Sequence, residues 1–72
     1  MNEEVFNLEL RKFLKKFGVT AQREIEKAVQ AGLERGALSG DETLHVEATL
    51  SMGSILPALR IDGDIALTRS AP

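Results

Sequence analysis

The chain has 72 residues, of which 43% are hydrophobic, 28% are charged and 4% are aromatic, and its formal net charge at pH 7 is −2. This composition indicates one small globular domain over residues 1–72 and argues against a disordered chain. Because the chain contains no Cys, neither disulfides nor thiolate metal sites can support so small a core. Oligomerisation is the remaining common source of support, so a homodimer is one expectation.

Apolar side chains recur with helical period from about residue 3 to residue 17, which predicts a first amphipathic helix. Asn2 is suited to cap its start, and Gly18 is suited to the left-handed position that ends a helix. We call the apolar residues of this helix the Phe stripe. They are Phe6, Leu10, Phe13, Leu14 and Phe17.

A second helix is predicted over about residues 20–35, with Thr20 as its N-cap and Gly36 as its C-terminal stop. Its apolar face consists largely of small residues, which allow another backbone to come close. The residues of this face are Ala21, Ile25, Ala28, Val29, Gly32 and Leu33. Two helices joined by a tight turn would form an αα-hairpin or corner.

After a turn at residues 39–42 the period changes to two, which predicts strands at about residues 43–51 and 59–68 and a frayed tail at 69–72. The alternation suggests a register with Leu50 opposite Ile61. That register also places Glu47 opposite Asp64, an unfavourable pair that a slip of two residues would relieve.

The predicted fold is therefore a small α+β domain of order α-α-β-β, with two helices packed on an antiparallel β-hairpin. Twelve residues are expected to form its core: Phe6, Leu10, Phe13, Leu14, Phe17, Ile25, Val29, Leu33, Val46, Leu50, Ile61 and Ile65.

The first candidate site is the basic face of the first helix, defined by Arg11, Lys12, Lys15 and Lys16. It could contact phosphate or an acidic partner, or it could be a solvated face whose lysines complement the helix dipole. The predicted order of elements, a helix, a turn, a second helix and a hairpin, loosely resembles a winged helix-turn-helix. This resemblance suggests an alternative function as a nucleic-acid-binding module. The net negative charge argues against nucleic acid as a partner.

A second candidate is an association patch of apolar residues outside the expected core, defined by Val5, Leu8, Ile55 and Leu56. The alternative is a wider core, in which the first helix contacts both the second helix and the sheet. A lone hairpin also has unpaired edges that invite pairing with a second copy, and such pairing would give a four-stranded sheet. The leading functional hypothesis is thus a non-enzymatic protein–protein interaction or self-associating module.

The sequence predicts no catalytic residues and no cofactor-binding or metal site, so an enzyme is not expected. The single His, His45, is expected to share the outer face of the hairpin with Glu47, Asp62 and Asp64. Their spacing matches no metal motif, and the preferred interpretation is a solvated sheet face. No small-molecule substrate and no membrane partner are predicted.

Nearly the whole chain follows one pattern, which is MNE-x-x-FN, then RKFLKK-x-GVT-x-QREIEKAV, then G-x-L-x-G-x-E-x-L and a closing D-G-[DE]-I. By this pattern the chain resembles a family of short uncharacterised bacterial proteins of unknown function. The resemblance implies a bacterial, cytoplasmic origin and no known activity. The acidic N-terminal sequence, which has neither a signal peptide nor a membrane span, agrees with a cytoplasmic location.

Overall fold

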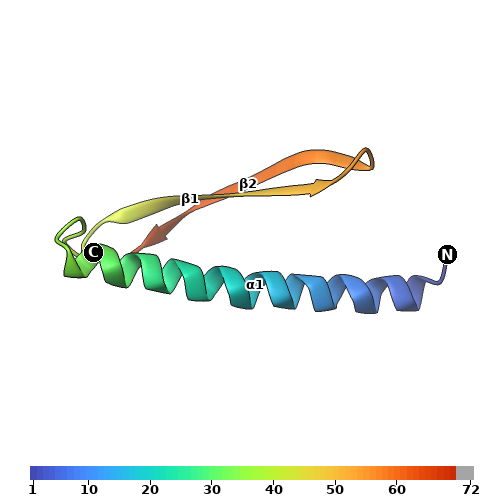
Figure 1. Ribbon diagram of the computed structural model, residues 1–72, viewed down its shortest axis with the longest axis horizontal. Coiled ribbons are helices and arrows are strands. Elements are labelled where there is room, and N and C mark those ends of the chain that lie inside the picture. Colours follow the sequence, from blue (N-terminus) through green and yellow to red (C-terminus); the bar gives the residue numbers. More distant parts are fainter. Residues whose placement is uncertain (70–72) are drawn as a thin grey trace. The chain divides into compact units, whose positions relative to one another are not determined.

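The computed structural model describes residues 1–69, which form two compact units. The first unit contains one helix, α1 (Glu3–Glu34), and the second contains the strands β1 (Thr43–Met52) and β2 (Leu56–Ala66) (Figure 1). The α+β class and the antiparallel hairpin are confirmed. The predicted tail at 69–72 lies outside the described residues except for Arg69, which follows β2 in irregular structure.

Helix α1 begins and ends where its capping residues predict. The Asn2 side chain accepts a hydrogen bond of 3.1 Å from the backbone N–H of Val5, as an N-cap should. At the other end Gly36 adopts a φ of 79°, and its N–H donates to the Leu33 carbonyl. The N–H of Ala37 donates to the Gly32 carbonyl, which completes a Schellman motif.

The prediction of two helices is wrong, because α1 runs through Gly18 and Thr20 without a break (Figure 1). A glycine inside a helix costs about 1 kcal/mol relative to alanine. Ending the helix there would leave up to four N–H and four C=O groups without intrahelical partners and would require a second nucleation. The strong helix formers on both sides of Gly18 therefore outweigh its cost.

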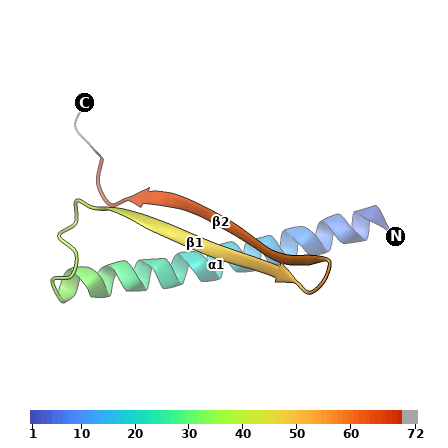
Figure 2. The ribbon, with the colours of Figure 1, turned by 90° about the horizontal axis from the view of Figure 1, so that it is seen from above.

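The two strands lie side by side and form a two-stranded antiparallel sheet (Figure 2). The predicted register is wrong by two residues, since Leu50 pairs with Leu59 and Ala48 pairs with Ile61. The connection is shorter than expected: Met52 already pairs with Leu56, after an irregularity between Leu50 and Met52. Gly53, with a φ of 59°, permits this tight turn.

Neither unit has an interior of its own, because one helix and one two-stranded sheet are each a single layer. The sequence predicted a twelve-residue core, but within residues 1–69 no hydrophobic side chain is buried. Four members of the set, Ile25, Val29, Val46 and Leu50, are half-buried, and the other eight are exposed. Gly32 is the one buried residue of α1.

Candidate functional site

The Phe stripe is an exposed apolar surface on the N-terminal half of α1. Its residues are exposed by 41% to 52% of their surface. The rings of Phe13 and Phe17 stack with centroids 6.5 Å apart and planes inclined by 18°. Beside them is a shallow hollow of about 290 Å³, lined by Phe13, Lys16, Phe17, Thr20, Ala21 and Glu24. An exposed aromatic surface on a regular helix is suited to contact another apolar surface.

The basic face lies in the middle of the continuous helix rather than at a helix end. Lys15 and Lys16 therefore cannot complement a C-terminal dipole at Phe17, as the sequence suggested, because α1 continues to Glu34. Lys12 Nζ lies 3.6 Å from Glu9 Oε2, so part of the positive charge is neutralised along the helix. Contact of this face with phosphate or an acidic partner stays a prediction.

Because the structure has a single helix among the residues it describes, it does not have the layout of a winged helix-turn-helix. That motif needs a second helix after a turn, and the structure has one helix in the range 1–69. Nucleic-acid binding by the basic face is not tested by this difference and remains an alternative prediction.

The predicted association patch is divided between the two units. Val5 and Leu8 lie on α1, where they are 55% and 60% exposed, on the side of the helix away from the Phe stripe. Ile55 is 83% exposed in the turn of the hairpin, and Leu56 is half-buried at the start of β2. Each pair is accessible within its own unit.

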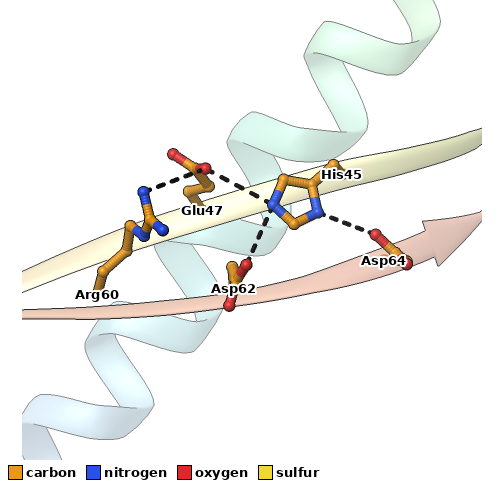
Figure 3. A network of polar contacts seen from close by, with 5 residues as sticks. All are labelled: His45, Glu47, Arg60, Asp62 and Asp64. Atoms are coloured by element: carbon orange, nitrogen blue, oxygen red, sulfur yellow. Dashed lines mark hydrogen bonds and ion pairs between the residues drawn. The ribbon is translucent and has the colours of Figure 1, made fainter.

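One face of the hairpin carries a connected set of polar side chains, which are one imidazole, one guanidinium and three carboxylates (Figure 3). His45 Nδ1 lies 3.0 Å from Asp64 Oδ1, and His45 Nε2 lies 3.2 Å from Asp62 Oδ2 and 3.6 Å from Glu47 Oε1. Arg60 NH1 lies 3.7 Å from the same Glu47 oxygen. The sequence correctly placed the His and the three carboxylates on one face, but the observed register was needed to show which atoms meet.

This polar network is an open surface feature. Its members are exposed by 48% to 68%, so water competes for each contact. In the part of the chain that the structure describes, no group of His, Asp and Glu side chains is arranged to hold a metal ion. The contacts of the network therefore lie on one open face of the hairpin.

The opposite face of the hairpin is apolar. Cross-strand pairs share a face, so Leu44 with Ile65 and Leu50 with Leu59 lie on the side away from the His45 network. The β1 residues of this face are half-buried, whereas Leu59, Ile61 and Ile65 of β2 are 42%, 58% and 39% exposed. This face gives the hairpin an apolar surface whose exposure to water is unfavourable in free energy.

Sequence reasoning missed the role of Glu42, which holds the loop before β1. Its carboxylate accepts hydrogen bonds of 2.9 Å from the backbone N–H groups of Ser39 and Gly40. These hydrogen bonds favour the charged form and lower the pKa of the Glu42 carboxyl below its usual value. The S-G-D-E order, with an acidic side chain two and three residues after the N–H groups it binds, is the signal that could have predicted the contact.

Comparison with known proteins gives one family match. A model of a family of unknown function (DUF6494) matches residues 1–68. No curated protein and no solved structure matches the chain. The resemblance to a family of unknown function is thus confirmed, and the match assigns no activity to any residue. Among residues 1–69, no helix combines the length and apolar character needed to cross a membrane.

Proposed function

The chain belongs to the DUF6494 family, whose function is unknown, and we propose from its own surfaces that it is a non-enzymatic, self-associating protein–protein interaction module. The observation that carries the proposal is the exposure of its apolar side chains. Within residues 1–69 no hydrophobic side chain is buried, although 43% of the whole chain is hydrophobic. Folded domains normally bury such surface, and here a second chain can do so.

The helix supplies the first argument. An isolated helix in water gains little from propensity alone, and most helical stability in proteins comes from packing an amphipathic face. Phe6, Phe13 and Phe17 are each about half exposed. Covering this face with apolar side chains of another chain would stabilise α1 along the N-terminal half of its 32 residues.

The hairpin supplies the second argument. A two-stranded hairpin alone is marginal in water, and each strand of this one has an unpaired edge in the described part of the chain. Its apolar face leaves Ile61 more than half exposed. A partner that covers this face would bury its apolar side chains. A partner that extends the sheet would pair an open strand edge.

The non-enzymatic part of the proposal rests on the chemistry of the residues. The chain has no Cys and a single His. The contacts of that His are with the carboxylates of Glu47, Asp62 and Asp64, so it does not activate a hydroxyl nucleophile. The proposal retains a bacterial cytoplasmic setting, which rests on the family resemblance alone.

Sedimentation equilibrium of the full chain, from about 1 to 300 µM, tests the proposal. We expect a mass that rises with concentration towards a defined oligomer. Capture of untagged chain by a tagged copy provides a second readout. A strict monomer over the whole range, together with no captured copy, would contradict the proposal.

A further inference from the structure

The N-terminal half of α1 has a spacing of apolar residues that is the same in both chain directions. Phe6, Leu10, Phe13 and Phe17 are separated by four, three and four residues. This is the spacing of alternating d and a positions in a two-stranded coiled coil. The next two positions of a strict heptad are Thr20 and Glu24, so the coiled-coil pattern ends within the helix.

A spacing that is the same in both chain directions is suited to the association of two copies related by a two-fold axis. Suppose that two copies of α1 lie antiparallel, with a two-fold axis between Arg11 and Lys12. The residue numbers of two residues that face each other then add up to 23. Phe6 then faces Phe17 of the second copy, and Leu10 faces Phe13 of the second copy. Every layer contains one d and one a residue, as in antiparallel coiled coils, and both copies use the same surface, as a two-fold interface requires.

The charges beside the stripe favour the antiparallel direction. At 100° per residue, Glu9 and Lys16 lie about 70° to 90° from the centre of the stripe, on the same flank. In the antiparallel arrangement Glu9 of one copy and Lys16 of the other are offset by about 3 Å along the axis. Each dimer gains two such attractive pairs. In a parallel arrangement the flank opposite Glu9 carries Leu14, and no attractive pair forms.

The remaining basic residues do not oppose this pairing. Arg11, Lys12 and Lys15 lie about 130° or more from the centre of the stripe, on the outer face of α1. Lys12 is paired there with Glu9 of its own helix at 3.6 Å. The outer basic residues therefore stay in water when two stripes meet.

The area is adequate for an interface of ordinary size. A buried aromatic side chain covers about 200 Å², so three half-exposed Phe rings contribute about 300 Å² per chain. Each partner of a standard interface contributes about 800 Å². The Phe rings thus supply more than a third of that area, and Leu10 and Leu14, at 41% and 52% exposure, add to it.

We propose that two copies of this chain associate through an antiparallel pair of α1 helices, in which the Phe stripes meet and Glu9 pairs with Lys16 of the second copy. This inference rests on the proposed self-association and specifies the surface and its direction. The overlap covers residues 3–20 of each helix, about 27 Å at 1.5 Å per residue.

Charge exchange tests the pairing. We expect Glu9→Lys to raise the dimer Kd about tenfold in sedimentation equilibrium, because each dimer then contains two repulsive pairs. Glu9→Lys/Lys16→Glu should restore the original Kd within about threefold. The matched control is Lys12→Glu, which breaks the same intrahelical ion pair on the outer face and should leave the Kd unchanged. If Glu9→Lys and Lys12→Glu have equal effects, the pairing is wrong.

A distance measurement tests the direction. The chain has no Cys, so Gln22→Cys introduces a single site for a spin label on the outer face. The antiparallel pair offsets the two labels by about 30 Å along the axis, whereas a parallel pair leaves no offset. A measured separation below about 30 Å overturns the antiparallel arrangement, because the axial offset is the smallest distance that this arrangement allows.

Phe13→Glu separates this inference from the more general proposal. It should raise the Kd by at least 100-fold, with circular dichroism reporting whether the chain stays folded. Dimers that survive Phe13→Glu would overturn the stripe as the interface but leave self-association standing. A strict monomer in the unaltered chain would overturn both. A monomer that binds anionic phosphatidylserine vesicles through the stripe would also overturn the dimer, in favour of a membrane surface.

Discussion

Glu47 and Asp62 stand directly opposite each other across the hairpin, and the imidazole of His45 lies within 3.6 Å of a carboxylate oxygen of each. Directly opposed like charges destabilise a strand pair. Here His45 and the Arg60 guanidinium, which lies 3.7 Å from Glu47, compensate the opposition. The observed register differs from the predicted one by two residues, so Glu47 faces Asp62 instead of Asp64. The neighbouring side chains offset the repulsion between these two carboxylates.

Removing that compensation should weaken the hairpin. We expect His45→Ala to lower the free energy of unfolding by about 0.5–1 kcal/mol, the range of exposed cross-strand pairs. Urea denaturation at pH 6 measures the change. The loss should shrink in 1 M NaCl, where exposed charges are screened. Thr49→Ala, on the same face of β1, is the control for lost strand propensity. An equal loss in both variants would contradict the role of His45.

Gly18 should tolerate a side chain, because it lies inside a continuous helix. A Cβ built at Gly18 meets nothing within 4 Å, and its backbone does not have a positive φ. We expect Gly18→Ala to raise the free energy of unfolding by about 0.5–1 kcal/mol. Thermal denaturation followed at 222 nm measures the change.

Gly36→Ala is the matched comparison, because Gly36 has a φ of 79°. We expect it to lower stability by about 1 kcal/mol, since alanine is strained in the left-handed region. If Gly18→Ala were the more damaging change, α1 would end near Phe17 in solution, as the sequence pattern predicted.

Glu42 should make stability depend on pH. Hydrogen bonds from the N–H groups of Ser39 and Gly40 lower its pKa in the folded state. A lowered carboxyl pKa contributes stability above the unfolded pKa, and this contribution is lost as the pH falls through the folded pKa. We therefore expect the urea concentration at the midpoint of unfolding to decrease as the pH is lowered below the usual glutamate pKa of about 4.3.

The matched variant is Glu42→Gln, which should be less stable than the unaltered chain at pH 6, and this difference should shrink as the pH falls below the usual glutamate pKa. An NMR titration of the Glu42 carboxyl should give a pKa below the usual value of a glutamate side chain. A titration at the usual value would contradict the prediction.

Nucleic-acid binding by the basic face has its own test. A protein that used Arg11, Lys12, Lys15 and Lys16 on phosphates would show a slope of log K against log salt near −3.6 on duplex DNA, and neutralising one lysine would reduce that slope by about 1. We expect weak binding at 20 mM salt that Lys12→Gln/Lys16→Gln does not change selectively. The control is Arg23→Gln/Lys27→Gln. A selective loss in the Lys12/Lys16 variant would favour the nucleic-acid alternative.

Several features of α1 follow from local sequence. The Asn2 cap and the Gly36 stop were predictable because each depends on one side chain, or its absence, next to a helix end. The continuity of α1 also had a local signal that was overlooked. Phe17, Ala21, Ile25 and Val29 follow at steps of four across Gly18, so the apolar face keeps its phase through the expected break.

The candidate site was predicted only in part. The Phe stripe and the basic face were identified correctly as the two sides of one amphipathic helix, because helical geometry fixes them. The prediction that the stripe lies in a closed core is wrong, because its residues are exposed. The association patch at Val5, Leu8, Ile55 and Leu56 stays a prediction. Burial depends on which elements pack together, and the pattern of a single helix does not contain that information.

The sequence by itself determined the α+β content, the caps of α1, the two faces of the hairpin and the lack of any cysteine chemistry. Only the tertiary structure decided the register, because a slip of two residues leaves every side chain on the same face. The short turn at Gly53, which brings Met52 opposite Leu56, selects among registers that the alternation alone cannot distinguish. The structure likewise shows that α1 within its own unit leaves the Phe stripe exposed, because burial requires a second layer that this unit does not contain.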